Sequence, residues 1–314
     1  MRVLFAGTPA FALPSLRAIA GAAGHVPAGV LTMPDRPAGR GRALAPPPVK
    51  LHAIELGLPV LQPKRPSSPE SLEAIASLAP DVIAVVAYGR ILKKVFLDLT
   101  PHGCLNLHAS ILPEYRGAAP IERAVQEGRT ETGVTIMRID EGLDTGDILL
   151  VRRTPIGPEE TAGELSARLS EIGAGLLVEA LDRIERGDCP RIPQDHDRAT
   201  HAPPIDKEEA RIDWSRPAGV VVNLVRAMNP RPVAFADTPR GPLRVYRARA
   251  VGRGGVAGTV LAADPKGGLV VAAGEGAVRL LEVQLPGKKR MEDRALLSGV
   301  GFETGVPLAG GGGW

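Results

Sequence analysis

Residues 81–86 read Asp81-Val82-Ile83-Ala84-Val85-Val86, a continuous apolar run rich in β-branched side chains. Such a run without polar alternation is typical of a strand that is covered on both faces of a parallel sheet. Residues 2–6, 26–31 and 104–108 predict further strands, and helical spacing at 11–20, 69–77 and 120–126 falls between strands. This alternation predicts a Rossmann-like, doubly wound α/β domain with a mainly parallel sheet.

The pattern changes after the longest helix, which we expect at residues 161–186 from one apolar stripe. Residues 187–204 are polar and proline-rich. Beyond them, short runs at 243–248, 258–263, 268–273 and 277–285 are punctuated by Gly and Pro, as in a small OB-like β-barrel. We therefore expect a catalytic domain at 1–189, a linker at 190–206 and a C-terminal domain at 207–314.

Composition and charge limit the class of protein. The chain has 314 residues, of which 44% are hydrophobic and 3% aromatic. Two cysteines, Cys104 and Cys189, form no disulfide framework, which favours a reducing cytosol, and no apolar run approaches the ~20 residues of a membrane span. Residues 1–205 hold 22 Lys and Arg against 24 Asp and Glu, whereas residues 206–314 hold 16 against 11. A basic final third favours a polyanionic partner, although a randomly basic domain explains the charge equally well.

Residues 32–48 show no periodicity and are rich in Pro, Gly and Arg. We expect an irregular loop, which is too long to be an idle connection in a compact domain. Arg36, Arg40 and Arg42 could contact nucleic-acid phosphates. A disordered surface insertion is the alternative.

Several cofactor classes lack their motifs. The first strand ends in Gly7-Thr8-Pro9 rather than G-x-G-x-x-G, which disfavours a nicotinamide oxidoreductase. The sequence contains no G-x-x-x-x-G-K-[ST] for a nucleoside triphosphate, and its six His and two Cys have no zinc-site spacing.

Two polar stretches could carry chemistry. Asn106 and His108 point to the same face of a strand, at the carboxyl end where open α/β sheets bind ligands. An amide beside an imidazole suits an oxyanion, although a structural Asn and a solvated His explain the pattern equally well. Residues 140–147 contain four acids and could be a metal loop, an exposed acidic turn, or a source of one carboxylate that orients the imidazole.

These residues carry a family resemblance. Asn106-Leu107-His108, Ser110-Ile111-Leu112-Pro113 and Tyr115-Arg116-Gly117-Ala118-Ala119-Pro120 together resemble the motif of the folate-dependent formyltransferase family. Asp144, within Gly142-Leu143-Asp144-Thr145-Gly146-Asp147, is similar to the aspartate of that family. The stretches at 5–9, 34–41, 207–214 and 285–289 resemble the branch that acts on initiator methionyl-tRNA.

The resemblance implies site residues. Asn106, His108 and Asp144 would be catalytic, and no metal would take part. Ser110, Ile111, Leu112 and Pro113 would bind the folate, in a family that reads the pterin largely with backbone groups. Arg36, Arg40 and Arg42 would contact tRNA, together with the basic C-terminal domain.

The implied reaction transfers the formyl group of 10-formyltetrahydrofolate to the α-amino group of methionine on initiator tRNA, for translation initiation. We expect a monomer in the bacterial cytoplasm that does not bind a membrane. Sugar-nucleotide and glycinamide ribonucleotide formyltransferases are the alternatives within the family. A noncatalytic RNA-binding protein would explain the basic C-terminal third but not Asn106, His108 and Asp144.

Overall fold

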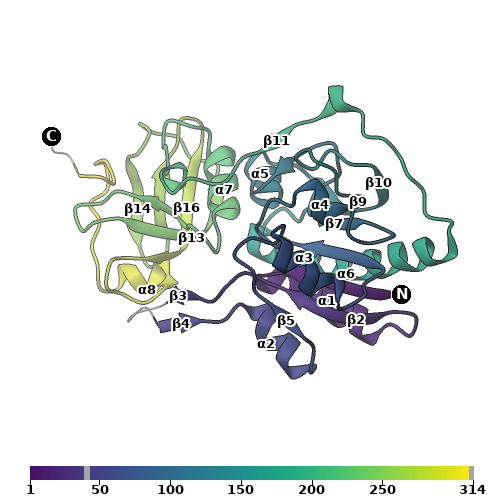
Figure 1. Cartoon of the computed structure of the whole chain (residues 1–314). Coiled ribbons are helices and arrows are strands. Elements are labelled where there is room, and N and C mark those ends of the chain that lie inside the picture. The colour runs from purple at the N-terminus through teal and green to yellow at the C-terminus, as the bar shows by residue number, and fades with distance from the viewer. Residues whose placement is uncertain (39–42, 311–314) are drawn as a thin grey trace. The chain divides into compact units, whose positions relative to one another are not determined.

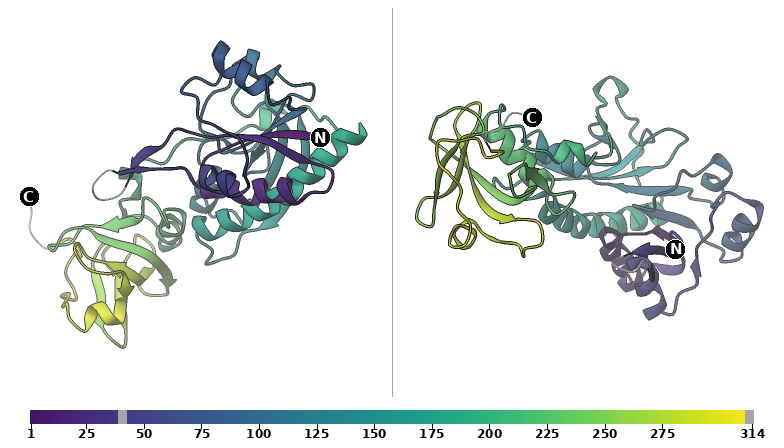
Figure 2. Two further views of the ribbon diagram at one scale, coloured as in Figure 1. Left: turned by 60° about the horizontal axis from the view of Figure 1, so that its bottom comes forward. Right: turned by 90° about the vertical axis from the view of Figure 1, so that its left-hand side faces the viewer.

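The computed structural model describes residues 1–38 and 43–310. The chain forms two compact units, shown in Figures 1 and 2 and described separately here. The first unit contains residues 1–120, 131–155 and 166–202, and the second contains residues 121–130, 156–165 and 203–314.

A seven-stranded sheet forms the centre of the first unit. Its order is β10-β9-β7-β6-β1-β2-β5. The strands are β1 (Arg2–Gly7), β2 (Val26–Leu31), β5 (Val60–Leu61), β6 (Val82–Val86), β7 (Cys104–His108), β9 (Glu131–Arg138) and β10 (Ile148–Pro155). The five strands from β7 to β5 are parallel, whereas β9 and β10 are antiparallel to their neighbours. The mainly parallel sheet of the sequence prediction is confirmed.

Helices cover this sheet. They are α1 (Leu13–Gly21), α2 (Pro48–Glu55), α3 (Pro69–Ala76), α4 (Lys94–Leu97) and α6 (Ala162–Arg186), with a 3₁₀ turn at Ala10–Ala12. All five residues of β6 are buried, as expected for a central strand with both faces covered. Ile83 packs with Ile75 of α3 and Phe96 of α4 in one cluster.

The arginine-rich stretch after β2 is more regular than expected. It contains two short antiparallel strands, β3 (Arg36–Ala38) and β4 (Ala43–Ala45). The expectation of an irregular loop over residues 32–48 was therefore wrong at these six positions. Period-two alternation gave no signal, because neither strand is long enough to show it.

Residues 190–202, which the sequence places in a linker, are hydrogen-bonded to the first unit. A 3₁₀ turn spans His196–Arg198, and β11 (His201–Ala202) pairs in parallel with β8 (Arg116–Gly117). Ile192 also exchanges backbone hydrogen bonds with Ile148. This segment is therefore part of the first unit's structure.

The second unit is a smaller β domain, as predicted. Its strands follow the order β12-β13-β16-β15-β14, with β17 on β16, and every pair is antiparallel. The elements are α5 (Pro120–Gln126), a 3₁₀ turn (Glu208–Ala210), α7 (Ala218–Ala227), β12 (Ala234–Ala236), β13 (Leu243–Val251), β14 (Val260–Asp264), β15 (Gly268–Ala272), β16 (Ala277–Gln284), β17 (Met291–Glu292) and α8 (Asp293–Leu297). Residues 305–308 cover the open edge of β14 with backbone hydrogen bonds, which protects it from pairing with other chains.

Two segments from the middle of the chain belong to this second unit. Arg123 of α5 forms an ion pair with Glu209, with Nη1 and Oε2 2.5 Å apart. Arg226 of α7 donates to the backbone oxygens of Gly157 and Glu160 at 3.0 Å. The second unit is thus assembled from three separate parts of the sequence.

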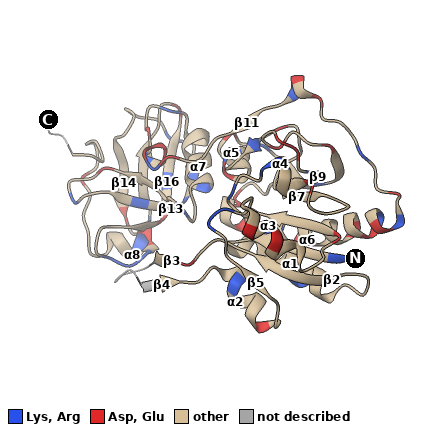
Figure 3. Ribbon diagram, viewed as in Figure 1, with Lys and Arg blue, Asp and Glu red and all other residues tan. Residues whose placement is uncertain are grey.

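Charged residues occur on both units (Figure 3). In the second unit, exposed basic residues recur along the strands and turns. Among the described ones are Arg244, Arg249, Arg253, Lys266, Lys288 and Lys289. Within the part of the chain that the structure describes, no helix combines the length and apolar character needed to cross a membrane.

Candidate active site

Asn106 and His108 lie at the carboxyl end of β7, which runs parallel to β6. The strand alternates its faces as predicted. Cys104 contacts the backbone oxygens of Phe96 and Leu97 on one side, while Leu107 packs close to Gly173 of α6 on the other. Asn106 and His108 therefore share the Cys104 face of the strand.

The His108 ring is buried, with a hydrogen bond at Nε2 and a carboxylate oxygen near Nδ1. Its Nε2 lies 2.9 Å from the carbonyl oxygen of Tyr115, and its Nδ1 lies 3.6 Å from Oδ2 of Asp144. A carbonyl can only accept, so Nε2 carries the proton of that hydrogen bond. Both ring nitrogens therefore face acceptor atoms.

Asp144 is fixed by the turn that carries it. Its backbone has φ +53°, a left-handed conformation that few residues other than glycine adopt. Its Oδ2 accepts a hydrogen bond of 2.9 Å from the backbone N–H of Gly117. Gly146 approaches the chain so closely that a Cβ there would lie 2.0 Å from the carbonyl oxygen of Arg138. Only glycine fits that position without backbone movement.

Asn106 presents an uncommitted amide. It is half-buried, and its side chain has no hydrogen-bond partner among the described residues. A side-chain amide at the end of a strand, beside a held imidazole, can donate to an oxygen that arrives from outside.

The turn from Ser110 to Pro113 comes shortly after β7 in the chain. The Ser110 hydroxyl is buried and donates to the backbone oxygen of Glu114 at 2.6 Å. Thr135 Oγ1 donates to the carbonyl oxygen of Ser110 at 2.7 Å and lies 3.2 Å from the backbone nitrogen of Leu112. The Ser110 side chain therefore stabilises this turn, and contacts from the turn to a ligand would be made by its other groups.

Tyr88 lies just after β6, the strand that pairs with β7 in the sheet. Its side chain is 1% exposed, and no described residue is a hydrogen-bond partner of its hydroxyl. Burial raises the pKa of the phenol to about 12, and Arg90 opposes the shift. Tyr88 is therefore neutral at physiological pH and contributes no charge to the site.

The sequence did not single out three residues that support this site. Arg116 is 5% exposed and Gln194 6% exposed, and the two side chains are hydrogen-bonded. Thr200 Oγ1 accepts from the backbone N–H of Tyr115 at 2.8 Å. Arg116 is part of the quoted motif, but Gln194 and Thr200 gave no local signal, because their partners are about 80 residues away in sequence.

The three arginines assigned to tRNA are only partly described. Arg36 is exposed on β3. Arg40 and Arg42 lie outside the described residues. Lys50 and Gln62 hold Asp35, immediately before β3, through hydrogen bonds of 2.7–2.9 Å.

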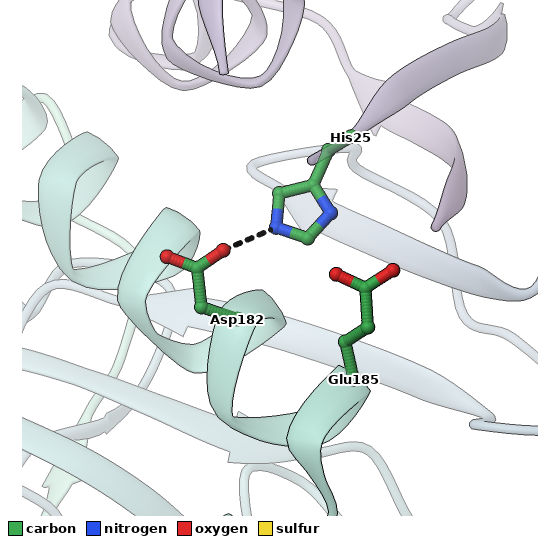
Figure 4. A group of neighbouring side chains, drawn as sticks. All are labelled: His25, Asp182 and Glu185. Carbon is green, nitrogen blue, oxygen red and sulfur yellow. Dashed lines mark hydrogen bonds and ion pairs between the residues drawn. The ribbon is translucent and has the colours of Figure 1, made fainter. Parts of the chain in front are cut away.

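A group with metal-ligating side chains occurs elsewhere in the first unit. Among the described residues, His25, Asp182 and Glu185 offer ligand atoms within 4.8 Å of one another (Figure 4). His25 Nε2 lies 2.9 Å from Asp182 Oδ1, and Glu185 pairs with the amino group of Met1 at 2.9 Å. His25 precedes β2, so this group lies at the amino end of the parallel strands, whereas His108 lies at the carboxyl end.

The chain resembles curated proteins along almost its whole length. It is 51% identical over 313 residues to the methionyl-tRNA formyltransferase of Moorella thermoacetica, covering 98% of this chain and 99% of that protein. It is 47% identical over 309 residues to the methionyl-tRNA formyltransferase of Symbiobacterium thermophilum, covering 98% and 94%.

Comparison with solved structures supports the fold. HypX from Aquifex aeolicus, in complex with tetrahydrofolic acid, matches 96% of this chain with a TM-score of 0.63 and 20% identity. The chain spans 48% of the length of that protein.

Family models match both parts of the chain. Residues 1–181 match the formyl transferase family and residues 204–301 match the formyl transferase C-terminal domain. With both matches and relatives of about 50% identity over their full length, this chain belongs to the methionyl-tRNA formyltransferase family.

Proposed function

We propose that this protein transfers the formyl group of 10-formyltetrahydrofolate to the α-amino group of methionine on initiator tRNA, with Asn106, His108 and Asp144 as its catalytic residues. The observation that carries the proposal is the uncommitted Asn106 amide beside an imidazole that faces Asp144 at 3.6 Å. The relatives named above support the choice of methionyl-tRNA as acceptor.

In this mechanism the neutral α-amine of methionine attacks the formyl carbon, and the carbonyl electron pair moves to the oxygen. An α-amine has a pKa of about 7.7–8.0, so a useful fraction is already neutral near pH 7. The Asn106 amide donates to the new oxyanion, and His108 supplies positive charge beside it. When the intermediate collapses, the bond to N10 of the folate breaks, and N10 takes the electron pair and, in the end, the proton released by the amine.

Asp144 orients His108 in this scheme and stabilises its charged form. The reaction needs no covalent enzyme intermediate, and we propose that it needs no metal ion. The acceptors on both ring nitrogens of His108 would keep the ring in one orientation throughout the reaction.

The folate would bind along Ser110, Ile111, Leu112 and Pro113, together with the stretch after β6. Because the Ser110 hydroxyl is engaged within its own turn, we infer that backbone groups and the half-buried Ile111 and Pro113 would make the contacts. The folate-bound HypX structure shares the fold only, so this placement stays a prediction.

The tRNA would be held by Arg36, Arg40 and Arg42 and by the basic second unit. We expect Arg40→Ala to raise the KM for methionyl-tRNA while leaving the KM for the folate unchanged, because Arg40 would contact a phosphate. Losing one phosphate contact reduces the slope of log KM against log salt concentration by about 1. Arg17→Ala is the matched control, since Arg17 is exposed on α1. If the slope of log KM against log salt concentration is unchanged in Arg40→Ala, Arg40 makes no phosphate contact with the tRNA.

One assay separates the proposed function from its alternatives. The protein is incubated with 10-formyltetrahydrofolate and, in separate reactions, with methionyl initiator tRNA, glycinamide ribonucleotide or an amino-sugar nucleotide. We expect formylation of the tRNA alone. Transfer to either of the other acceptors, or to none, would overturn the proposal.

Domain organisation, oligomeric state and compartment complete the proposal. We propose a catalytic domain at 1–189, a linker at 190–206, of which residues 190–202 pack within the first unit, and a tRNA-binding domain at 207–314, in a monomer that works in the bacterial cytoplasm, where initiator tRNA is charged. Light scattering on the purified protein measures the oligomeric state directly.

A further inference from the structure

Gln194 joins the proposed linker to the turn that carries Asp144. Its side chain is almost fully buried and both ends of its amide are used. Nε2 donates to the backbone oxygen of Asp144 at 2.9 Å and to that of Gly146 at 2.7 Å. Oε1 accepts from Arg116 at 3.1 Å from Nε and 2.6 Å from Nη2.

The two carbonyls that Gln194 holds lie on either side of Thr145. Asp144 occupies a left-handed backbone conformation with φ +53°, which persists only where the surroundings support it. The donations from Gln194 support this turn from one side, and the Gly117 N–H holds the Asp144 carboxylate from the other. Gln194 therefore contributes directly to where the carboxylate lies.

Arg116 fixes the orientation of the Gln194 amide. A guanidinium only donates and a backbone carbonyl only accepts, so the amide oxygen must face Arg116 and its nitrogen must face the turn. Arg116 Nη2 also lies 3.1 Å from Nδ1 of His196. Within the described residues, no carboxylate lies within 4.0 Å of this buried guanidinium. Among the described residues, its side-chain hydrogen bonds are with Gln194 and His196.

The same segment also contacts Tyr115, the residue whose carbonyl oxygen is hydrogen-bonded to His108. Thr200 Oγ1 and its backbone oxygen accept from the N–H groups of Tyr115 and Arg116, each at 2.8 Å. The Tyr115 carbonyl accepts from His108. Residues 194 and 200 thus contact the supports of both members of the His108–Asp144 pair.

We propose that Gln194, oriented by Arg116, is a positioning residue for formyl transfer, and that it acts through Asp144. This inference rests on the proposed function, because it assumes that Asp144 is catalytic. The proposed linker, residues 190–206, would then support the reaction as well as connect the two domains.

The test begins with Gln194→Ala. Because a displacement of about 1 Å can cost about 10²-fold in rate, we expect kcat to fall about 10- to 100-fold with little change in either KM. Gln126→Ala is the matched control, since Gln126 also accepts from an arginine, at 3.0 Å from Arg123, but in the second unit. We expect it to keep kcat within about twofold of the wild type.

Gln194→Glu tests the positioning role of Gln194 without leaving a cavity in place of the side chain. The carboxylate keeps the volume of the side chain and pairs with Arg116, but it cannot donate to the two carbonyls. We expect a folded protein with a lower thermal unfolding midpoint, because a carboxylate oxygen would face the two backbone carbonyls with no proton between them, and we expect kcat to fall as in Gln194→Ala. A folded Gln194→Glu variant with wild-type kcat would overturn the proposal.

A double-mutant cycle distinguishes positioning from a general structural role. Single-turnover rates with excess enzyme are measured for Gln194→Ala, Asp144→Asn and the double variant. If Gln194 acts through Asp144, its replacement costs less than twofold more once Asp144 is changed. An equal loss in both backgrounds would overturn the positioning role. If Asp144→Asn alone leaves the rate unchanged, the proposed function loses its catalytic assignment, which is a separate result.

Discussion

Replacing His108 by alanine is expected to lower kcat for formyl transfer about 10²–10³-fold, the usual cost of losing one stabilising group of an oxyanion. Both KM values change little, because the stabilising charge acts on the intermediate more than on the bound substrates. The fold is retained, since His108 lies at the end of β7 and the neighbouring strand pairs do not depend on its ring.

The measurement is a steady-state assay with methionyl initiator tRNA and 10-formyltetrahydrofolate, accompanied by circular dichroism. His102→Ala is the control, because His102 precedes the opposite end of β7 and the structure gives its ring no hydrogen bond. Near-normal turnover of a folded His108→Ala variant would contradict the catalytic assignment. Asn106→Ala is expected to behave in the same way, through loss of the amide donor.

Asp144→Asn is expected to lower kcat by about 10² or more, because the change removes the negative charge that faces the imidazole while keeping the shape of the side chain. The asparagine oxygen can take the place of Oδ2 and still accept from the Gly117 N–H, so Nδ1 of His108 then faces a neutral amide oxygen in place of a carboxylate. The geometry of the contact is kept, and the loss comes from the missing negative charge beside the imidazole.

Glu141→Gln provides the control for Asp144→Asn. It removes one negative charge from the same acidic loop, but Glu141 is exposed and lies outside the His108 contacts. Turnover within about twofold of the wild type is expected for it. Equal losses in both variants would mean that the charge of the whole loop matters, and the specific role of Asp144 would be withdrawn.

The sequence predicted most of the first unit's sheet because its strands have clear local patterns. The run at 82–86 is buried on both faces as expected, and the short runs after residue 240 became β13 to β16. Strands β3 and β4 were missed because their three-residue lengths show no period. The membership of residues 121–130 in the second unit was also invisible, because it depends on pairs such as Arg123 with Glu209, 86 residues apart.

The candidate site was predictable in part. Strand alternation placed Asn106 and His108 on one face, and the family motif pointed to Asp144. The structure brings the imidazole and the carboxylate together, while the catalytic roles stay predictions. No local pattern could reveal Gln194, because its value comes from partners at Arg116, Asp144 and Gly146 that meet it only in the folded chain. The metal-loop interpretation of residues 140–147 gains no support from the contacts that their side chains make.

The second unit is formed by three separate segments of the sequence, and this limits where the protein can be cut or recombined. The chain passes between the two units five times before it ends, and two ten-residue segments of the second unit come from the middle of the sequence. A fragment that begins at residue 203 would lack the Gly157 and Glu160 carbonyls that satisfy Arg226, and the Glu164 carboxylate that pairs with Arg247. A chimaera that joins two relatives at that residue would therefore divide the contacts of one compact unit between two parents.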